Sequence, residues 1–282
     1  MAFTDNLPGS GTQDDPWIVT TYDELVGAAD SGDGKYIKVN NDIDIADTYP
    51  NGDMPRLVIS SRVDGNNKTI SNWYKTTSAD TVIYINEYGQ LTNLALNNIY
   101  HNLGANYFIG IGSNNISDYH VKNCSFKGVL TKKFASLTYT TDMNFYSCSF
   151  KLQLSDNFMV GTGMLNTDSI GIANCYIDVN HSSNTALLFD GGLSNGSCSN
   201  SYIKCNCKLG KESRIWNCVC EIHNDIDDYS LSGDISQDKN IFSLEYAPNI
   251  TAGNAAYIAV PADKWLDVSW LADQGFNIAG GD

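Results

Sequence analysis

A short phrase recurs along this chain: a small polar residue, usually Asn, followed by a run in which side chains alternate between two environments. Its copies begin at six anchor residues separated by 30, 24, 27, 26 and 17 positions. A recurrence in this range, with one strand per copy, is typical of a solenoid rather than of a closed globule. The anchors are Asn93, Asn123, Ser147, Asn174, Asn200 and Asn217.

Superimposing the copies gives columns of similar residues. The first and third positions after each anchor are mostly apolar, and the second and fourth are mostly polar or tyrosine. Because side chains alternate across a strand, we expect the first set to face a core and the second to face water. The inward columns are Leu94, Cys124, Cys148, Cys175, Ser201 and Cys218, then Leu96, Phe126, Phe150, Ile177, Ile203 and Cys220; the outward ones are Ser125, Ser149, Tyr176, Tyr202 and Val219, then Lys127, Lys151, Asp178, Lys204 and Glu221.

This pattern predicts an all-β fold, a right-handed, single-stranded parallel β-helix whose rungs of about 24 residues stack roughly 4.8 Å apart. We assign the rungs to residues 35–245. The anchor Asn fits a tight bend before each strand, because Asn tolerates the left-handed backbone region better than most residues. Stacked Asn side chains can also hydrogen-bond along the rod.

Both ends of the chain have the composition of caps, which a solenoid needs to cover its terminal core. We assign residues 1–34 to an N-terminal cap and residues 246–282 to a C-terminal cap of the same structural domain. Residues 17–19 predict a strand, and the capping-box spacing of Thr21 and Glu24 predicts a short helix after it. Residues 255–260 predict a second strand, followed by an apolar cluster of Trp265, Leu266, Trp270, Leu271 and Phe276, with Gly275 as a helix stop.

The charge of the chain limits its partners. The net charge is −15 and the sequence pI is about 4.4, which argues against a nucleic-acid backbone or an anionic membrane as partner. We expect a solvated acidic surface, with calcium binding by clustered carboxylates as the alternative. No apolar run reaches the roughly 18 residues that cross a bilayer. The first six residues also lack the features of a secretory signal, so we expect no membrane insertion and synthesis in a bacterial cytoplasm.

Eight cysteines allow three interpretations. Cys205 and Cys207, together with Cys218 and Cys220, supply four thiols, the number in a structural zinc site. Neither pair has the usual spacing of zinc ligands, and stacked neighbours such as Cys124 and Cys148 could instead form a disulfide. Free cysteine is among the most buried residue types, and the register places most of these thiols inside. We therefore favour buried thiols and predict no metal site and no cofactor.

Catalytic chemistry on a β-helix would require convergent outward groups. Hydrolases use two carboxylates about 5–10 Å apart, but the visible pairs, Asp14-Asp15 and Asp227-Asp228, lie in turn-like sequence. Asp142 and Asp190 also fit turns, and His223 fits a surface position. We therefore predict no catalytic residue and a protein that is not an enzyme. If the protein is nevertheless an enzyme, we expect a polysaccharide lyase or a glycoside hydrolase.

Tyrosines stand out among the outward positions. Tyr176 and Tyr202 share one column. Aligned tyrosines can stack on sugar rings, pack in a protein interface, or simply pack across strands of the sheet. We favour an interface, because buried contact patches are enriched in aromatic residues. Further tyrosines are Tyr74, Tyr100, Tyr107, Tyr119 and Tyr139.

The N-terminal residues carry a family resemblance. The run from Gly9 through Asp14-Asp15-Pro16-Trp17 leads into residues 22–25 and then into Lys38-Val39-Asn40-Asn41-Asp42-Ile43-Asp44. This resembles the opening of pectate-lyase-like parallel β-helix proteins of bacterial surface adhesins and of tailed phages, especially those of gut bacteria. The resemblance covers residues 9–45 well, and residues 270–276 look like the closing cap of some of these chains. It implies a β-helix used as a scaffold or binding surface and transfers no catalytic residue.

These observations lead to one main hypothesis and two alternatives. The main one is a non-enzymatic structural protein of a bacteriophage virion, a capsid decoration protein or a tail- or fibre-associated component. Its partners would be other virion proteins, with a homotrimer as one option. The first alternative is a phage tailspike that binds or degrades a host surface polysaccharide. The second is a fragment of a bacterial surface adhesin.

Overall fold

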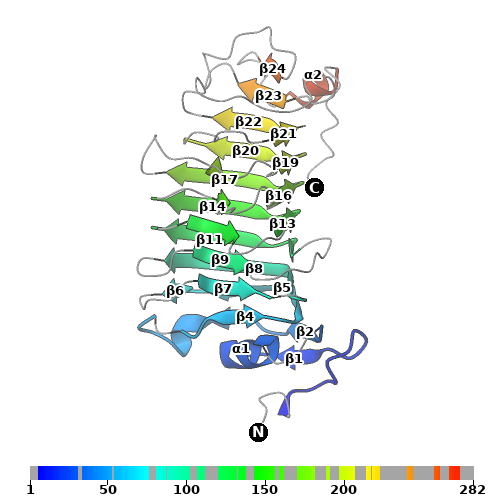
Figure 1. Cartoon of the computed structure of the whole chain (residues 1–282), viewed down its shortest axis with the longest axis vertical. Coiled ribbons are helices and arrows are strands. Elements are labelled where there is room, and N and C mark those ends of the chain that lie inside the picture. The colour runs from blue at the N-terminus through cyan, green and yellow to red at the C-terminus, as the bar shows by residue number, and fades with distance from the viewer. Residues whose placement is uncertain are drawn as a thin grey trace.

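Parallel strands stack into a ladder that runs from the N-terminal to the C-terminal end of the molecule (Figure 1). The structure is a computed structural model. It describes residues 6–30, 34–52, 54–75, 81–86, 88–101, 107–111, 120–131, 133–137, 143–155, 159–161, 170–181, 189–190, 197–206, 214–216, 218–222, 240–243, 257–260 and 267–273. The fold is an all-β parallel β-helix, as the repeat predicts.

The described strands form two sheets. The larger, sheet A, contains β1 (Trp17–Val19), β2 (Tyr36–Val39), β3 (Ile43–Asp44), β5 (Arg62–Ser71), β6 (Tyr74–Lys75), β8 (Gln90–His101), β10 (Val121–Lys122), β11 (Ser125–Leu130), β13 (Met143–Tyr146), β14 (Ser149–Leu154), β16 (Ile170–Ala173), β17 (Tyr176–His181), β19 (Ser197–Ser199), β20 (Tyr202–Cys205), β21 (Arg214–Trp216), β22 (Val219–Ile222), β23 (Asn240–Ser243) and β24 (Tyr257–Val260). Sheet B contains β4 (Leu57–Ile59), β7 (Thr81–Ile85), β9 (Tyr107–Ile111), β12 (Lys133–Leu137), β15 (Met159–Gly161) and β18 (Phe189–Asp190).

The register of sheet A reproduces the columns of the repeat. One column runs through β11, β14, β17, β20 and β22, and each of its residues pairs with the next: Phe126 with Phe150, Phe150 with Ile177, Ile177 with Ile203, and Ile203 with Cys220. These strands pair in parallel, and equivalent residues of successive copies lie directly opposite one another. The predicted stacking of the rungs is therefore confirmed for this part of the ladder.

The core between the two sheets is aromatic in its middle rungs. The rings of Phe126 and Phe150 stack with centroids 5.3 Å apart and planes 7° apart. Phe134 of sheet B meets both edge-on, at 5.1 Å and 5.3 Å. Phe145 lies 5.4 Å from Phe150. All four side chains are buried, so each rung packs on its neighbours and across the molecule.

The anchor residues adopt the left-handed conformation that the sequence predicts. Asn93, Asn123, Ser147, Asn174 and Asn200 have φ angles between 48° and 55°, while Asn217 lies outside the described residues. The Asn123 amide donates a 3.1 Å hydrogen bond to the Asn93 side chain, which donates one of 3.0 Å to Asp64. A second row links Asn98 to Asn72 and Asn72 to Asp44. The amides thus tie the first bends together.

The described cysteines are buried thiols that form no disulfide, which confirms the buried-thiol interpretation for seven of the eight; Cys207 lies outside the described residues. The Cys148 backbone N–H donates a 3.2 Å hydrogen bond to the Cys175 sulfur. Burial raises the pKa of the Cys124 thiol to about 12, so the neutral form dominates at physiological pH. These thiols act as small apolar side chains in the core.

Residues 1–34, which we predict to be the N-terminal cap, contain the expected strand and helix. β1 pairs in parallel with β2 and so begins the ladder. α1 (Tyr22–Asp30) buries Leu25, Ala28 and Ala29 against it. The Tyr22 ring meets the buried Trp73 edge-on at 5.7 Å, which ties the helix to the core. A 3₁₀ helix, η2 (Ile45–Asp47), follows β3.

The predicted capping box at the start of α1 is present. The Glu24 N–H donates to Thr21 Oγ1 at 3.3 Å, and Glu24 Oε2 accepts from the Thr21 N–H at 3.1 Å. The same carboxylate oxygen accepts two further bonds, from the Thr20 N–H at 2.6 Å and the Thr20 hydroxyl at 2.9 Å. Burial raises the pKa of Glu24, but these hydrogen bonds outweigh that effect, and the pKa lies below its ordinary value.

We expect Glu24→Gln to lower the free energy of unfolding at pH 7 by about 1 kcal/mol. Because the folded-state pKa of Glu24 is depressed, its charge stabilises the fold above the unfolded-state pKa, and this contribution is lost as pH falls through the folded value. The difference between wild type and variant should therefore shrink below about pH 4. Denaturant unfolding at pH 7 and pH 3 measures it, and an unchanged difference at pH 3 would contradict the assignment.

The C-terminal residues also contain the expected elements. β24 forms over residues 257–260 of the strand predicted for 255–260, whose first two residues lie outside the described part, and it pairs with β23. α2 (Val268–Asp273) begins after Asp267, whose side chain accepts a 3.0 Å hydrogen bond from the Trp270 N–H. α2 lies at the same end of the molecule as β23 and β24 (Figure 1). Trp265, Leu266, Gly275 and Phe276 lie outside the described residues. Neither described helix has the length and apolar character needed to cross a bilayer.

Candidate binding site on the outer face

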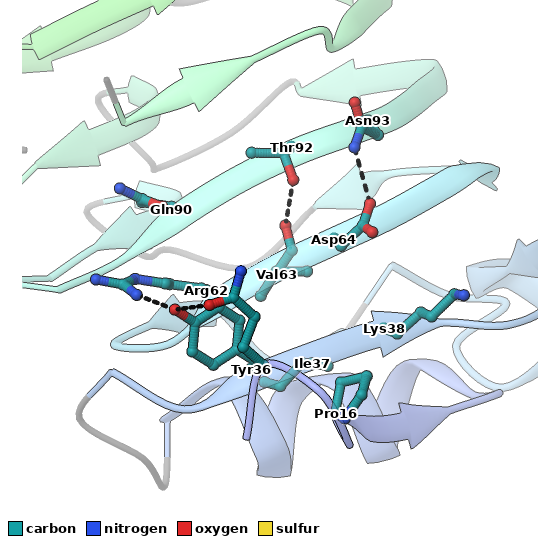
Figure 2. Close-up of a pocket in the computed structure, with 11 residues that line it drawn as sticks. Pro16, Tyr36, Ile37, Lys38, Arg62, Val63, Asp64, Gln90, Thr92 and Asn93 are labelled. Carbon is teal, nitrogen blue, oxygen red and sulfur yellow. Dashed lines mark hydrogen bonds between the residues drawn. The ribbon is translucent and has the colours of Figure 1, made fainter. Parts of the chain in front are cut away.

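A groove of about 280 Å³ lies on the outer face of sheet A near the N-terminal end (Figure 2). Its base is formed by β2, β5 and β8, and Gln13 and Pro16 of the loop before β1 line one side. The loop is held there by backbone hydrogen bonds from the Tyr36 N–H to the Gly11 carbonyl, 3.1 Å, and from the Ile18 N–H to the Pro8 carbonyl, 2.9 Å.

Strand alternation and register place the polar side chains of the groove. In each of the three strands an inward residue is flanked by two outward ones. The register brings the outward residues into two rows across the strands, because Tyr36 pairs with Arg62 and Lys38 with Asp64. β8 completes the rows, which are Tyr36–Arg62–Gln90 and Lys38–Asp64–Thr92.

The first row is built around a tyrosine and an arginine. The Arg62 guanidinium carbon lies 5.1 Å from the centre of the Tyr36 ring, a cation–π distance, and the guanidinium donates a hydrogen bond to the Tyr36 hydroxyl. That hydroxyl also donates a long, 3.5 Å bond to Gln13 Oε1. The loop, Tyr36 and Arg62 thus hold one another in place, and the Arg62 guanidinium lies at one end of the groove (Figure 2).

The second row is built around a carboxylate. Asp64 Oδ1 accepts hydrogen bonds from the Asn66 N–H, 2.8 Å, and from Asn93 Nδ2, 3.0 Å. Thr92 Oγ1 donates a 3.2 Å bond to the Val63 carbonyl. These bonds hold Asp64 and Thr92 in place. They leave Asp64 Oδ2 and the Thr92 oxygen lone pairs without a hydrogen bond from any described residue, so both can accept from a ligand.

The groove is locally positive on an acidic protein. Its described lining includes two cations, Lys38 and Arg62, and one carboxylate, Asp64. The local balance is therefore about +1 against a net charge of −15 for the chain. A hydrolase needs two carboxylates about 5–10 Å apart, and the described lining has one, already engaged by two donors. The described lining therefore lacks the pair of carboxylates that such a hydrolase uses.

A second outward surface contains the predicted tyrosine column. The rings of Tyr176 and Tyr202 stack 5.3 Å apart with planes 3° apart, and Tyr176 is 43% exposed. The Tyr202 hydroxyl donates a hydrogen bond to Glu221, and Lys204 Nζ lies 3.0 Å from Glu221 Oε1. Burial and the bond to Glu221 raise the pKa of Tyr202, and Glu221 also raises the pKa of Lys204.

The prediction that Glu221 faces water is wrong. Its side chain points outward in the column of Lys204, but it is only 8% exposed, against 42% for Lys204. Its partners on the preceding rung, Tyr202 and Lys204, cover it and satisfy its carboxylate. A column taken from strand alternation gives the direction of a side chain, whereas its exposure depends on the length of the neighbouring side chains.

We expect Lys204→Ala to lower the free energy of unfolding by about 1–3 kcal/mol, because it leaves the largely buried Glu221 carboxylate without its cation. The double variant Lys204→Ala with Glu221→Gln should recover part of that loss. Lys127→Ala, in the same column but exposed, is the control and should change stability by less than about 0.5 kcal/mol. Equal effects of the two single lysine variants in urea unfolding would contradict the pairing.

The other residues considered from sequence gather into no site in the described structure. Asp14 and Asp15 are exposed in a turn, in which the Asp15 N–H donates to Thr12 Oγ1 at 3.2 Å. Asp142, His223, Asp227 and Asp228 lie outside the described residues, as does the side chain of Asp190. Within the described part, no three His, Cys, Asp or Glu side chains come close enough to hold a metal ion. The absence of a metal or cofactor stays a prediction.

Sequence reasoning did not predict the groove. A usable signal was present in the sequence. Three pairs of outward residues each flank one inward residue, and successive pairs are separated by 26 and 28 positions. The pairs are Tyr36 and Lys38, Arg62 and Asp64, and Gln90 and Thr92. Comparison with known proteins adds no further guidance: no family model, no curated protein and no solved structure matches the chain. The β-helix is shown by the fold, while the pectate-lyase-like and phage parts of the resemblance stay predictions.

Proposed function

We propose that the chain is a non-enzymatic structural protein of a bacteriophage virion, in which the β-helix is a rigid scaffold and its outer face binds a neighbouring virion protein. The observation that carries this proposal is a set of exposed apolar side chains on sheet A. Tyr74, Val129, Tyr146 and Tyr176 are 37–43% exposed. Tyrosine is enriched in protein interfaces, because it offers a large contact area and a hydroxyl.

The regular ladder supports a scaffold role. Parallel pairing fixes the backbone under each exposed tyrosine, so little conformational entropy is lost when a partner binds. The resemblance of residues 9–45 to phage-associated β-helix proteins supports the placement in a virion. Capsid decoration and tail association both fit this proposal, with or without a homotrimer.

Mass spectrometry of virus particles purified by density gradient from the source material tests the proposal. We expect the chain in the particle fraction at a fixed copy number relative to the major capsid protein, and immunogold labelling should place it on the capsid or on the tail. Particles that lack the chain would contradict the proposal.

Variants test whether the exposed side chains of sheet A form the interface. In an expression system that assembles particles, Tyr176→Ala should reduce incorporation of the chain at least tenfold. Lys127→Ala, on the same sheet and also exposed, should be incorporated like the wild type. Equal incorporation of both variants would exclude the Tyr176 surface as the interface.

A further inference from the structure

We propose that the outer face of sheet A around residues 95–100 of β8 is a self-complementary surface, on which a second copy of this chain binds with its rungs in the opposite order. This surface is separate from the groove, and the proposal holds whether or not the protein belongs to a virion. It uses two of the four exposed apolar side chains, Tyr74 and Val129, and leaves Tyr146 and Tyr176 for another partner.

One column of outward residues carries opposite charges at its two ends. It runs from β3 through β5, β8 and β11 to β14, and its residues are Asp44, Ser71, Asn97, Lys127 and Lys151, with Lys127 at the register shift between β8 and β11. Asp44, Lys127 and Lys151 are exposed. Asp44 therefore lies two rungs before the centre of the column, at Asn97, and Lys151 lies two rungs after it.

A second column on the same sheet is apolar, and its centre lies in the same strand. Tyr74 of β6 pairs with Tyr100 of β8, which pairs with Val129 of β11. Tyr74 and Val129 are 38% and 37% exposed, and the rings of Tyr74 and Tyr100 stack with centroids 5.1 Å apart. Because the stack holds the Tyr74 ring in place, little conformational entropy is lost when a partner covers it.

A twofold axis parallel to β8 and in the plane of the interface makes both columns complementary at once. This rotation reverses the order of the rungs and places each column opposite its own copy. Asp44 of one copy then faces Lys151 of the other, Tyr74 faces Val129, and each contact occurs twice. The residues of β8 at the centre face their own counterparts. Such a contact, in which two residues exchange places between the copies, is the closed interface of a homodimer.

The charges favour this antiparallel arrangement over a parallel one. In a parallel pair the same rungs would meet, so Lys127 and Lys151 would approach the same lysines of the second copy. Within one chain the two lysines already pair in neighbouring strands, where like charges repel. Asp178 follows Lys151 in the column, but among the described residues neither lysine forms an ion pair. Asp44 of an antiparallel copy supplies the missing opposite charge.

The size of the surface indicates the affinity to expect. Five rungs roughly 4.8 Å apart, with strands of about six residues, cover about 500 Å² per copy and about 1,000 Å² in total. This area is at the lower limit for a specific interface. The net charge of −15 also adds repulsion between two copies. We therefore expect a reversible dimer with a Kd of about 1–100 µM.

Sedimentation velocity of the full chain at protein concentrations from about 1 to about 300 µM tests the inference. The buffer should contain about 0.15 M salt, which screens the net charge of the two copies. We expect a monomer–dimer equilibrium. A chain that stays monomeric up to about 300 µM, or that forms a trimer, would overturn the proposal.

Variants locate the interface. Lys151→Asp places a carboxylate opposite Asp44 and should weaken the dimer at least tenfold, and Val129→Asp should do the same through the apolar column. Both positions are exposed, so neither variant should change the thermal unfolding midpoint. Lys35→Asp changes the net charge as much as Lys151→Asp but lies outside both columns, and it should dimerise like the wild type. An equal loss with Lys35→Asp would show that net charge alone controls association.

Mixing two variants tests the antiparallel register directly. Asp44→Lys should fail to dimerise on its own, because it faces Lys151 of the second copy. In a mixture of Asp44→Lys with Lys151→Asp, opposite charges meet at both contacts, so a heterodimer should form. Its absence, with both variants at the wild-type unfolding midpoint, would overturn the proposal. Asp44 also caps η2, so if Asp44→Lys does not fold, Lys151→Asp and Val129→Asp remain the deciding variants.

Discussion

Replacing Phe150 by Ala is expected to lower the free energy of unfolding by about 3–5 kcal/mol. Phe150 is fully buried. It stacks on Phe126 at 5.3 Å and meets Phe134 and Phe145 edge-on at 5.3 Å and 5.4 Å. Truncation removes apolar burial and leaves a cavity that the backbone ladder on both sides cannot close. Urea unfolding followed by circular dichroism measures the loss.

The neighbouring residue supplies the control for this experiment. Lys151 follows Phe150 in β14 and is exposed, so Lys151→Ala should change stability by less than about 0.5 kcal/mol. Because rungs contact mainly their neighbours, unfolding can proceed in more than one step. Hydrogen exchange at the β14 amides then gives the local loss directly. A loss below about 1 kcal/mol for Phe150→Ala would show that the aromatic stack contributes little.

Replacing Gly128 by Ala is expected to destabilise the chain by at least about 3 kcal/mol and to reduce its soluble yield. The register between β8 and β11 shifts next to this residue, which brings the two backbones close together. A Cβ atom at position 128 would lie 2.1 Å from the Ile99 carbonyl oxygen and 2.6 Å from Ile99 Cβ. The first contact is with backbone, so no side-chain rotation relieves it.

Gly34 is the matched control, because it separates steric overlap from backbone strain. Gly34 has a φ of 69°, and an added Cβ would meet no atom within 4 Å. Gly34→Ala should therefore cost only the left-handed conformational penalty, about 1–2 kcal/mol. If both substitutions have the same effect on the unfolding midpoint, close backbone approach is not what requires glycine at position 128.

The repeat alone predicts the fold and the inward columns. Both depend on the local alternation of apolar and polar residues, and this alternation is present in every copy of the repeat. The bends could be predicted for the same reason, since the backbone preference at each anchor is carried by one residue, which is Asn everywhere except at Ser147. The helix after Thr21 could also be predicted, because its capping box lies within four residues.

The groove could not be predicted in the same way. Its two rows depend on the register between β2, β5 and β8, which the intervals of 26 and 28 positions indicate but do not fix. Its side depends on how the loop containing Gln13 folds back onto Tyr36. The burial of Glu221 was missed because it depends on two long side chains of the preceding rung. These are tertiary effects between residues that no local pattern connects.

The row of paired strands has a consequence for how such a chain changes during evolution. Each level of sheet A bonds to the level before it and the level after it, as β14 does to β11 and β17. A complete coil can therefore be duplicated or deleted while the remaining coils keep their contacts. Relatives of this chain should therefore differ in length by whole coils. Duplication of coils within the gene would then set the length of the protein in steps of one coil.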